Sequence, residues 1–220
     1  MPSPPVWVSS MRTVIAEAFG SLANHGGSHL TIAPGGRFAV RSVADVNTTG
    51  GAPGTITNSG TVAKTLGGGT STIGPNLNFT NNSGGTLDAQ SGTLEFAGVN
   101  TFNDVTQFIG AGTNVVTSNS TFNGTMFSNG LTLRSGVFSG NGSFAGTTTW
   151  TGGTMGGVFA VPVGAVLNVS GADPKAIDGG GASLTNAGTT NLSGGASIAG
   201  AGTLQNDGIL NSSIVAGANV

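Results

Sequence analysis

The feature that most constrains this chain is a short unit of alternating apolar and polar residues closed by glycine and asparagine, seen most clearly in Leu77–Gly98. Leu77 and Phe79 alternate with polar neighbours, a polar corner follows at residues 81–85, and Leu87 begins a second alternating segment. Alternation with a period of two places every second side chain on one face of a strand. Glycine and asparagine accept the positive φ of a tight corner. The unit is therefore a short strand, a corner and another short strand, used repeatedly.

The unit returns at a regular spacing. Asn58 and Asn81 are 23 residues apart, and Asn186 and Asn206 are 20 residues apart, each at the corner after a strand. A period of about 20–24 residues made only of short strands is typical of a solenoid, in which stacked turns bury a core that one turn cannot bury alone. With three strands per turn we predict a right-handed parallel β-helix over residues 30–220, with roughly eight to ten turns ~4.8 Å apart. A β-sandwich is the alternative fold for Val99–Thr121, where the repeat is poorly visible.

Two further expectations follow from stacking. Asparagines at equivalent corners of successive turns are expected to form side-chain ladders. The apolar positions of the alternating segments are expected to form the core, and the adjacent pair Val166 and Leu167 tests the alternation. The predicted core residues are Leu77, Phe79, Leu87, Leu94, Phe96, Leu131, Leu133, Phe144, Val166, Leu167, Leu192 and Leu204.

Residues 1–29 are predicted to be an N-terminal extension with a short capping helix. Apolar residues recur at helical spacing in Met11–Phe19, Ser10 suits an N-cap, and Gly20 suits the helix end. We expect this helix to cover the first turn of the solenoid, as terminal repeats do. A signal peptide is the alternative, although no Lys or Arg precedes Arg12 and Glu17 interrupts the apolar run.

Composition narrows the function classes. The chain has 220 residues, of which 41 are glycine, and charged residues make up 6%, against a usual ~25%. A net charge of −2 leaves no basic stripe for phosphates, so nucleic acid is not expected as a partner. Cysteine is absent, which excludes disulfides and thiolate metal sites. No apolar run reaches the ~18 residues of a membrane-spanning helix.

Three segments carry a resemblance to a known group: Trp150–Met155, Val161–Gly171 and Leu184–Thr189. They are similar to the Gly/Asn/Thr-rich β-strand repeats of bacterial surface proteins, including autotransporter-like passengers and filamentous adhesins. Gly68–Ile73 and Phe79–Gly84 resemble the same group. The resemblance implies an extracellular or cell-surface, non-catalytic segment that forms a stiff rod for adhesion or assembly. The outward Thr, Ser and Asn side chains of such a rod suit weak, repeated contacts, so glycans or other surface proteins are the expected partners. The apolar residues Ile209, Leu210, Ile214 and Val215 near the C-terminus suggest end-to-end self-association or further turns in a longer parent.

A polysaccharide lyase or hydrolase on a β-helix is the first alternative. Asp88, Glu95 and Asp104 form the densest acidic group, and two of them on neighbouring strands could act as acid and base on a sugar. The nearest basic residues in sequence are Lys64 and Arg134. We expect these carboxylates to be solvated outward positions, and we assign no catalytic residue.

Other chemical motifs are weak. His25 and His29 lack a third metal ligand nearby other than Glu17, and Asp178–Gly181 has one Asp without the spacing of a calcium repeat. Gly67–Thr70 lacks the lysine of a phosphate-binding loop. We therefore expect no metal and no cofactor. A second alternative is an ice-binding solenoid, because Thr147–Thr151 offers an outward threonine row, but only once in the sequence.

Overall fold

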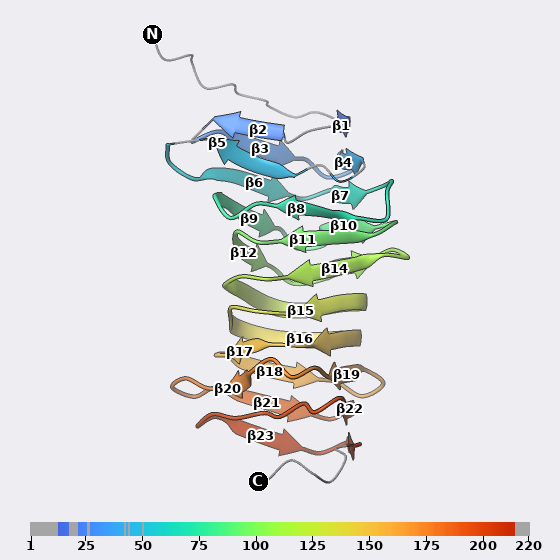
Figure 1. Ribbon diagram of the computed structural model, residues 1–220, viewed down its shortest axis with the longest axis vertical. Coiled ribbons are helices and arrows are strands. Elements are labelled where there is room, and N and C mark those ends of the chain that lie inside the picture. The colour runs from blue at the N-terminus through green and yellow to red at the C-terminus, as the bar shows by residue number, and fades with distance from the viewer. Residues whose placement is uncertain are drawn as a thin grey trace.

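The regular structure of this chain consists of strands. The computed structural model describes residues 13–17, 22–25, 27–41, 43, 45–49 and 51–213, and every regular element within these ranges is a strand. The strands stack into one tall coil of about nine turns (Figure 1). Each strand pairs in parallel with its counterpart in the next turn. The predicted all-β parallel β-helix is confirmed, and Val99–Thr121 belongs to the same coil rather than to a sandwich.

The coil has three faces, which we number in the order in which the chain visits them from β3 onward. The first face contains β3 (His29–Ile32), β6 (Gly54–Asn58), β9 (Leu77–Asn81), β12 (Val99–Phe102), β17 (Gly153–Met155) and β20 (Lys175–Ile177). The second face contains β1 (Thr13–Glu17), β4 (Arg37–Arg41), β7 (Thr61–Lys64), β10 (Thr86–Ala89), β13 (Thr106–Ile109), β18 (Val158–Val161), β21 (Ser183–Asn186) and β23 (Thr203–Asn206). The third face contains β2 (Leu22–His25), β5 (Val46–Thr49), β8 (Thr70–Ile73), β11 (Thr93–Phe96), β14 (Thr113–Val116), β19 (Val166–Val169), β22 (Thr189–Leu192) and β24 (Ile209–Ser212).

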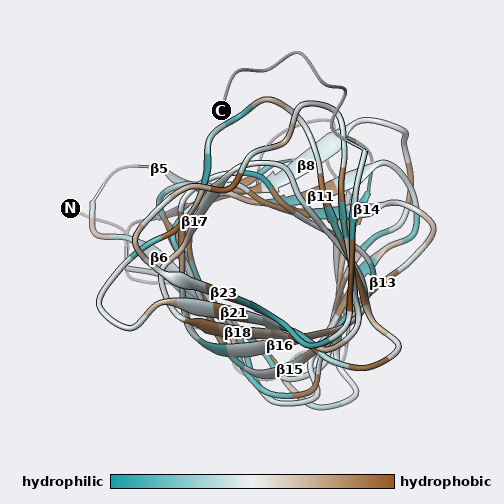
Figure 2. Ribbon diagram, turned by 90° about the horizontal axis from the view of Figure 1, so that it is seen from below, coloured by the Kyte–Doolittle hydropathy of each residue, from teal (hydrophilic) through white to brown (hydrophobic). Residues whose placement is uncertain are grey.

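Two long strands tie the three faces together in the middle of the coil. β15 (Ser120–Leu133) and β16 (Val137–Trp150) bend around the corners and pair with each other along almost their whole length. Viewed from the C-terminal end, the first, second and third faces follow one another counterclockwise as the chain advances toward the viewer (Figure 2). The coil is therefore right-handed, as predicted.

Alternation along each strand divides the chain into an inner wall and an outer surface. In β9, Leu77, Phe79 and Asn81 are buried, whereas Asn78 and Thr80 point outward. Val166 and Leu167 follow the same rule, because Leu167 is fully buried and Val166 is half-buried on the outside. The period-two pattern of the sequence therefore sets which side chains meet in the core.

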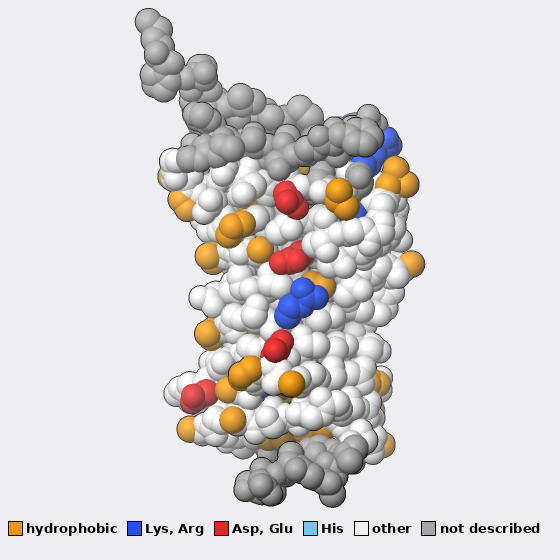
Figure 3. Space-filling model, viewed as in Figure 1, with side chains coloured by type: hydrophobic (Ala, Val, Ile, Leu, Met, Phe, Trp, Pro, Cys, Tyr) orange, Lys and Arg blue, Asp and Glu red, His pale blue; other side chains and the backbone are white. Residues whose placement is uncertain are grey.

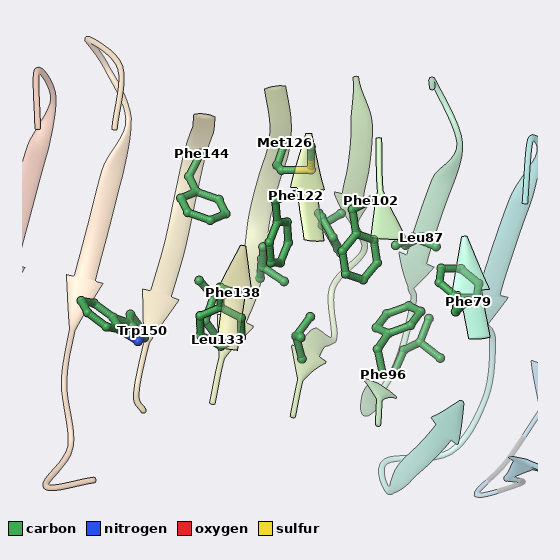
Figure 4. Packing of buried hydrophobic residues seen from close by; sticks show 14 of the residues in the cluster. Phe79, Leu87, Phe96, Phe102, Phe122, Met126, Leu133, Phe138, Phe144 and Trp150 are labelled. Carbon is green, nitrogen blue, oxygen red and sulfur yellow. The ribbon is translucent and has the colours of Figure 1, made fainter. Parts of the chain in front are cut away.

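Aromatic rings fill much of the core between successive turns. The ring centroids of Phe79 and Phe96 are 5.0 Å apart, those of Phe102 and Phe122 are 5.1 Å apart, and those of Phe122 and Phe144 are 5.5 Å apart. Figure 4 shows these rings following one another inside the tube, with Trp150 further along. Buried aromatic contacts of this kind add to the free energy gained from their burial alone.

Nine of the twelve predicted core positions are fully buried. The fully buried ones are Leu77, Phe79, Leu87, Leu94, Phe96, Leu131, Leu133, Phe144 and Leu167. Leu192 is partly buried, and Leu204 is 37% exposed. Leu204 stacks in register on the buried Leu184, so it faces inward, but it belongs to the last described turn. The prediction is wrong there because a core position is buried only when a turn lies beyond it.

The inner wall also contains the expected asparagine ladder. The Asn58 amide donates to Asn81 Oδ1 at 2.6 Å, and the Asn81 amide donates to Thr106 Oγ1 at 2.9 Å and to the Gly85 carbonyl at 2.9 Å. Asn186 donates to Asn206 Oδ1 at 2.6 Å on the second face. Asn58 and Asn81 are fully buried, and these bonds avoid the cost of leaving their amide groups unpaired.

Corners of successive turns approach each other closely. A Cβ atom at Gly60 would lie 2.3 Å from the Gly36 carbonyl oxygen, so only glycine fits this corner.

The number of residues in a turn varies along the coil. The residues that stack are 23 apart at Asn58 and Asn81 but 18 apart at Thr121 and Ser139. The pairing of β15 with β16 also contains a register shift between Ser128 and Leu131.

The N-terminal helix prediction is not confirmed. Within the predicted Met11–Phe19 helix, residues Thr13–Glu17 form β1 and pair in parallel with β4. The β-branched residues Thr13, Val14 and Ile15 favour a strand, and the edge of β4 offers hydrogen bonds that a helix cannot use. The remaining residues of the predicted helix lie outside the described ranges.

Candidate functional site: the outer surface of the first face

The first face presents an unbroken column of hydroxyl groups. Outward residues stack in register over six successive turns, and each is a threonine or a serine. These residues are Thr31, Thr57, Thr80, Thr101, Thr121 and Ser139. The first is exposed and the other five are half-buried, so their hydroxyls lie at the surface of a flat strand array. We call this set the hydroxyl column.

A second column runs beside the hydroxyl column, two residues further along each strand. Its members occupy the start of the corner between the first and second faces, and four of the five are asparagine. These residues are Ser59, Asn82, Asn103, Asn123 and Asn141. The backbone amides of Asn82 and Asn103 donate to the carbonyls of Asn58 and Asn81, which continues the parallel ladder into this column. We call this set the amide column.

Hydrogen bonds between turns hold both columns in place. The Asn82 amide donates to Ser59 Oγ at 2.8 Å, and the Asn123 amide donates to Asn103 Oδ1 at 3.1 Å. In the hydroxyl column, Thr121 and Ser139 are bonded at 3.1 Å. Each asparagine side chain has two donor hydrogens and an acceptor oxygen, so one such bond leaves further capacity for a ligand.

The second face has no column of comparable regularity. The equivalent outward column of the second face runs through residues of different chemistry: Arg37, Thr61, Thr86, Gln107, Phe127 and Ala145. Both columns lie on strands of the same coil. The preference of threonine for strands therefore does not by itself explain six hydroxyls in a row.

A short motif in the sequence marks both columns, although it does not recur at one fixed period. Thr/Ser-x-Asn/Ser occurs at residues 57–59, 80–82, 101–103, 121–123 and 139–141. Its spacing shrinks along the chain as the turns shorten from 23 to 18 residues. A search for one fixed period therefore does not align these triplets.

The acidic residues considered for catalysis are not brought onto one face. Asp88 lies on the second face and accepts a hydrogen bond from Gln90 at 2.6 Å. Glu95 lies on the third face and accepts one from Thr117 at 2.9 Å. Asp104 lies at a corner, where it accepts the backbone N–H of Thr125 at 2.6 Å. Each of the three carboxylates therefore accepts a hydrogen bond from a different local donor, and no two of them share a face.

The histidine and glycine motifs are corners and strand ends. His29 is exposed and contacts the Thr55 hydroxyl through Nδ1, while the side chain of His25 lies outside the described part of the chain. Asp178 accepts the N–H of Gly179 at 2.9 Å within its own corner. Among the described residues, no three His, Asp or Glu side chains form a group that could hold a metal ion.

Both lysines of the chain are buried. Lys64 Nζ donates to the Leu66 carbonyl at 2.9 Å, and Lys175 Nζ donates to the Gly171 and Asp173 carbonyls at 2.9 and 2.7 Å. Burial lowers the pKa of Lys64 below its ordinary value of 10.5. Burial also lowers the pKa of Lys175, and the nearby Asp173 charge partly opposes that shift. Neither ammonium group is available at the surface. On the face shown in Figure 3 the charged side chains are few, and several of them follow one another along the long axis of the coil.

The threonine row Thr147–Thr151 lies on the third face. Thr147, Thr149 and Thr151 point outward, whereas Thr148 and Trp150 are buried. The column through Thr149 continues into an asparagine ladder, in which Asn191 donates to Asn168 and Asn211 donates to Asn191, both at 2.9 Å. Neither position holds threonine in the next turn, because Thr147 stacks on Val166 and Thr149 stacks on Asn168.

The second face carries a shallow hollow of about 220 Å³ lined by Ile109, Phe127, Ser128, Asn129, Ala145 and Gly146. None of these six side chains titrates, so the hollow offers no acid or base.

The part of the chain that the structure describes contains no helix long and apolar enough to cross a membrane. Comparisons with protein-family models, with curated proteins and with solved structures found no match.

Proposed function

We propose that this chain is a non-catalytic structural and adhesive segment of a secreted or cell-surface protein. The observation that carries the proposal is the pair of uncharged, regularly spaced columns on the first face, built on a continuous buried core. Such a coil is a stiff rod, because each turn is bonded to the next along all three faces. Its outer surface offers many weak polar contacts whose sum can be large when a partner is also repetitive.

The resemblance to Gly/Asn/Thr-rich surface repeats of bacteria points in the same direction. It supports an extracellular location and glycans or other surface proteins as partners. The scarcity of charge agrees with that role, since 6% charged residues leave few groups for acid–base chemistry and none for a phosphate-binding stripe.

Incubation with pectin, alginate and glycosaminoglycans tests the non-catalytic part of the proposal. With and without Ca²⁺, we expect no release of unsaturated or reducing ends. Turnover that disappears in Asp88→Asn or Glu95→Gln would establish the lyase or hydrolase alternative instead. Asp207→Asn, an exposed acidic residue near the C-terminal end, is the matched control.

The exposed inward leucines of β23 and β24 support the proposal that copies of this chain associate end to end. Within the described residues, β23 and β24 pair with β21 and β22 on one side only. Leu210 stacks in register on the buried Thr190 and is 42% exposed, in the same situation as Leu204. An edge of this kind favours pairing with another strand. Ile214 and Val215, which were expected to extend this apolar end, lie outside the described ranges.

Light scattering over a range of protein concentrations tests end-to-end association. We expect the mass to rise with concentration and to fall in Leu204→Lys/Leu210→Lys, which places charges on the inward positions of this edge. Gln205→Lys adds a charge at an outward position of β23 and serves as the control. A mass that stays monomeric at every concentration would contradict association of this chain.

A further inference from the structure

The hydroxyl and amide columns of the first face together form a grid with a defined chemistry. Neither column contains a charged, aromatic or large aliphatic residue. Every member can both donate and accept a hydrogen bond. A complementary ligand is therefore neutral, rich in groups that also donate and accept, and repetitive along the axis of the coil.

We propose that this grid binds a neutral polysaccharide chain lying lengthwise along the first face. The inference rests on the adhesive role proposed above and assigns that role a surface and a ligand class. Hydroxyl groups of a neutral sugar match the grid because each is at once a donor and an acceptor. Successive turns are ~4.8 Å apart, close to the length of one residue in an extended β-1,4-linked sugar chain, so each turn can meet one sugar.

The grid is held in position before any ligand arrives. Phe102 and Phe122, which alternate with the outward residues of their strands, are fully buried and fix the backbone. The bonds from Asn82 to Ser59 and from Asn123 to Asn103 restrict the side chains themselves. Side chains that are already ordered lose less conformational entropy on binding, which raises affinity for the same contacts.

A third outward column flanks the hydroxyl column and adds apolar patches. Val99 is 60% exposed and Val137 is 46% exposed, and they lie among the polar residues Thr55, Asn78 and Asn119. The C–H face of a sugar ring can pack on such isolated valines. A protein partner is less well matched, because the core of a protein interface is enriched in aromatic residues that the grid does not offer.

Charge separates this ligand from anionic polymers. The two columns contain no Lys or Arg, and Asp104 follows Asn103 at the adjoining corner. A sulfated or uronic-acid polymer would meet no positive partner there and would be repelled by this carboxylate. The grid therefore fits an uncharged chain better than an acidic one.

Titration with β-1,4-glucan oligomers tests the proposal. We expect cellohexaose to bind more tightly than cellotriose, and cellobiose to bind most weakly, because longer chains reach more turns of the grid. Heparin oligomers of similar length are expected not to bind. Equal affinity for all lengths, or preferential binding of heparin, would overturn the assignment.

A matched pair of triple variants locates the binding surface. Thr80→Val/Thr101→Val/Thr121→Val removes three adjacent hydroxyls but keeps β-branched side chains that suit the strands. We expect roughly tenfold weaker binding of cellohexaose. Thr70→Val/Thr93→Val/Thr113→Val makes the same change at three stacked threonines on the outside of the third face and is expected to leave binding unchanged. Equal effects of the two triples, with circular dichroism unchanged in both, would contradict binding at the grid.

The remaining outcomes separate the grid from the broader proposal. Oligosaccharide binding that neither triple weakens would overturn the grid and leave the adhesive role intact. Cleavage of the oligosaccharide would overturn the non-catalytic role itself. Thermal hysteresis that the first-face triple abolishes, without any glycan binding, would overturn the grid as a glycan site and assign the face to ice.

Discussion

The inner wall and the outer surface of this coil are built from the same strands, and they solve different problems. In β9, Asn81 points inward and is fully buried, while its neighbour Asn82 belongs to the outward amide column. The side chain of Asn81 has four hydrogen-bond partners, whereas the side chain of Asn82 donates to Ser59 and is only half-buried. The regular spacing of residue types on the inner wall is imposed by packing. Regularity outside is not required by packing, as the mixed outer column of the second face demonstrates.

The largest difference between the two sides is expected at the phenylalanines of β15. Phe122 is fully buried against Phe102, Phe138 and Phe144, and Phe127 is 42% exposed on the outside of the same strand. Phe122→Ala should lower the free energy of unfolding by about 3–5 kcal/mol, because it leaves a cavity in the core. Phe127→Ala should change it by no more than about 0.5 kcal/mol. Urea denaturation measures both, and similar losses at the two sites would contradict a difference between the inner wall and the outer surface.

The two neighbouring asparagines test the same difference between inside and outside with polar side chains. Asn81→Ala removes the acceptor of the Asn58 amide and a partner of Thr106, so buried polar groups lose bonds. We expect a loss of about 1–3 kcal/mol in the free energy of unfolding. Asn82→Ala removes only a half-buried bond to Ser59 and should cost less than about 0.5 kcal/mol. A larger loss at Asn82 than at Asn81 would mean that the outer ladder, rather than the inner one, stabilises the corner.

Val105 offers a case in which the corner itself is strained. It has a φ of 61°, a left-handed conformation that β-branched residues avoid, and it is 39% exposed just after the amide column. Val105→Gly should stabilise the protein by about 1 kcal/mol, because relief of strain exceeds the added entropy of the unfolded chain. Val99→Gly, at an exposed strand position of the same turn, should instead be destabilising. Thermal denaturation of the two variants should therefore move in opposite directions, and a lower melting temperature for Val105→Gly would contradict the strain.

The fold was largely predictable because its strongest signals are local. Alternation around Phe79 and Leu87 predicts which side chains are buried, and the recurrence of Asn58 at Asn81 predicts stacking. The strand at Thr13–Glu17 was not predictable in this way, since its apolar residues also fit a helix and pairing with β4 decides the outcome.

The candidate site was less predictable because it depends on register between turns. Thr80 and Thr101 look unremarkable in the sequence, and only the pairing of β9 with β12 places them side by side. Corners of variable length separate the members of each column, so counting residues does not reveal the columns. The row at Thr147–Thr151 was visible because its threonines are consecutive, although its neighbours do not repeat it.

The buried lysines give the smallest effect and the only one that depends on pH. Burial lowers the pKa of Lys64 in the folded protein, while the unfolded chain keeps the ordinary value of 10.5. Between these two values the unfolded state binds more protons, so the free energy of unfolding should rise as the pH increases through that window. Lys64→Met should remove this rise for its site. Urea midpoints measured at several alkaline pH values give the slope.

A lysine introduced at an outward position supplies the control for the slope of stability against pH. Arg134 is exposed on the third-face side of the coil, so Arg134→Lys adds an ammonium group that stays in water in both the folded and unfolded states. Its pKa should be the same in both states, and the dependence of stability on pH should match that of the unaltered protein. The contrast between the two variants isolates what enclosure by the inner wall does to a charge. If Lys64→Met and the unaltered protein show the same slope while Lys175→Met lowers it, then the inner wall desolvates Lys175 alone. In that case the Leu66 carbonyl compensates the Lys64 ammonium for the water it has lost.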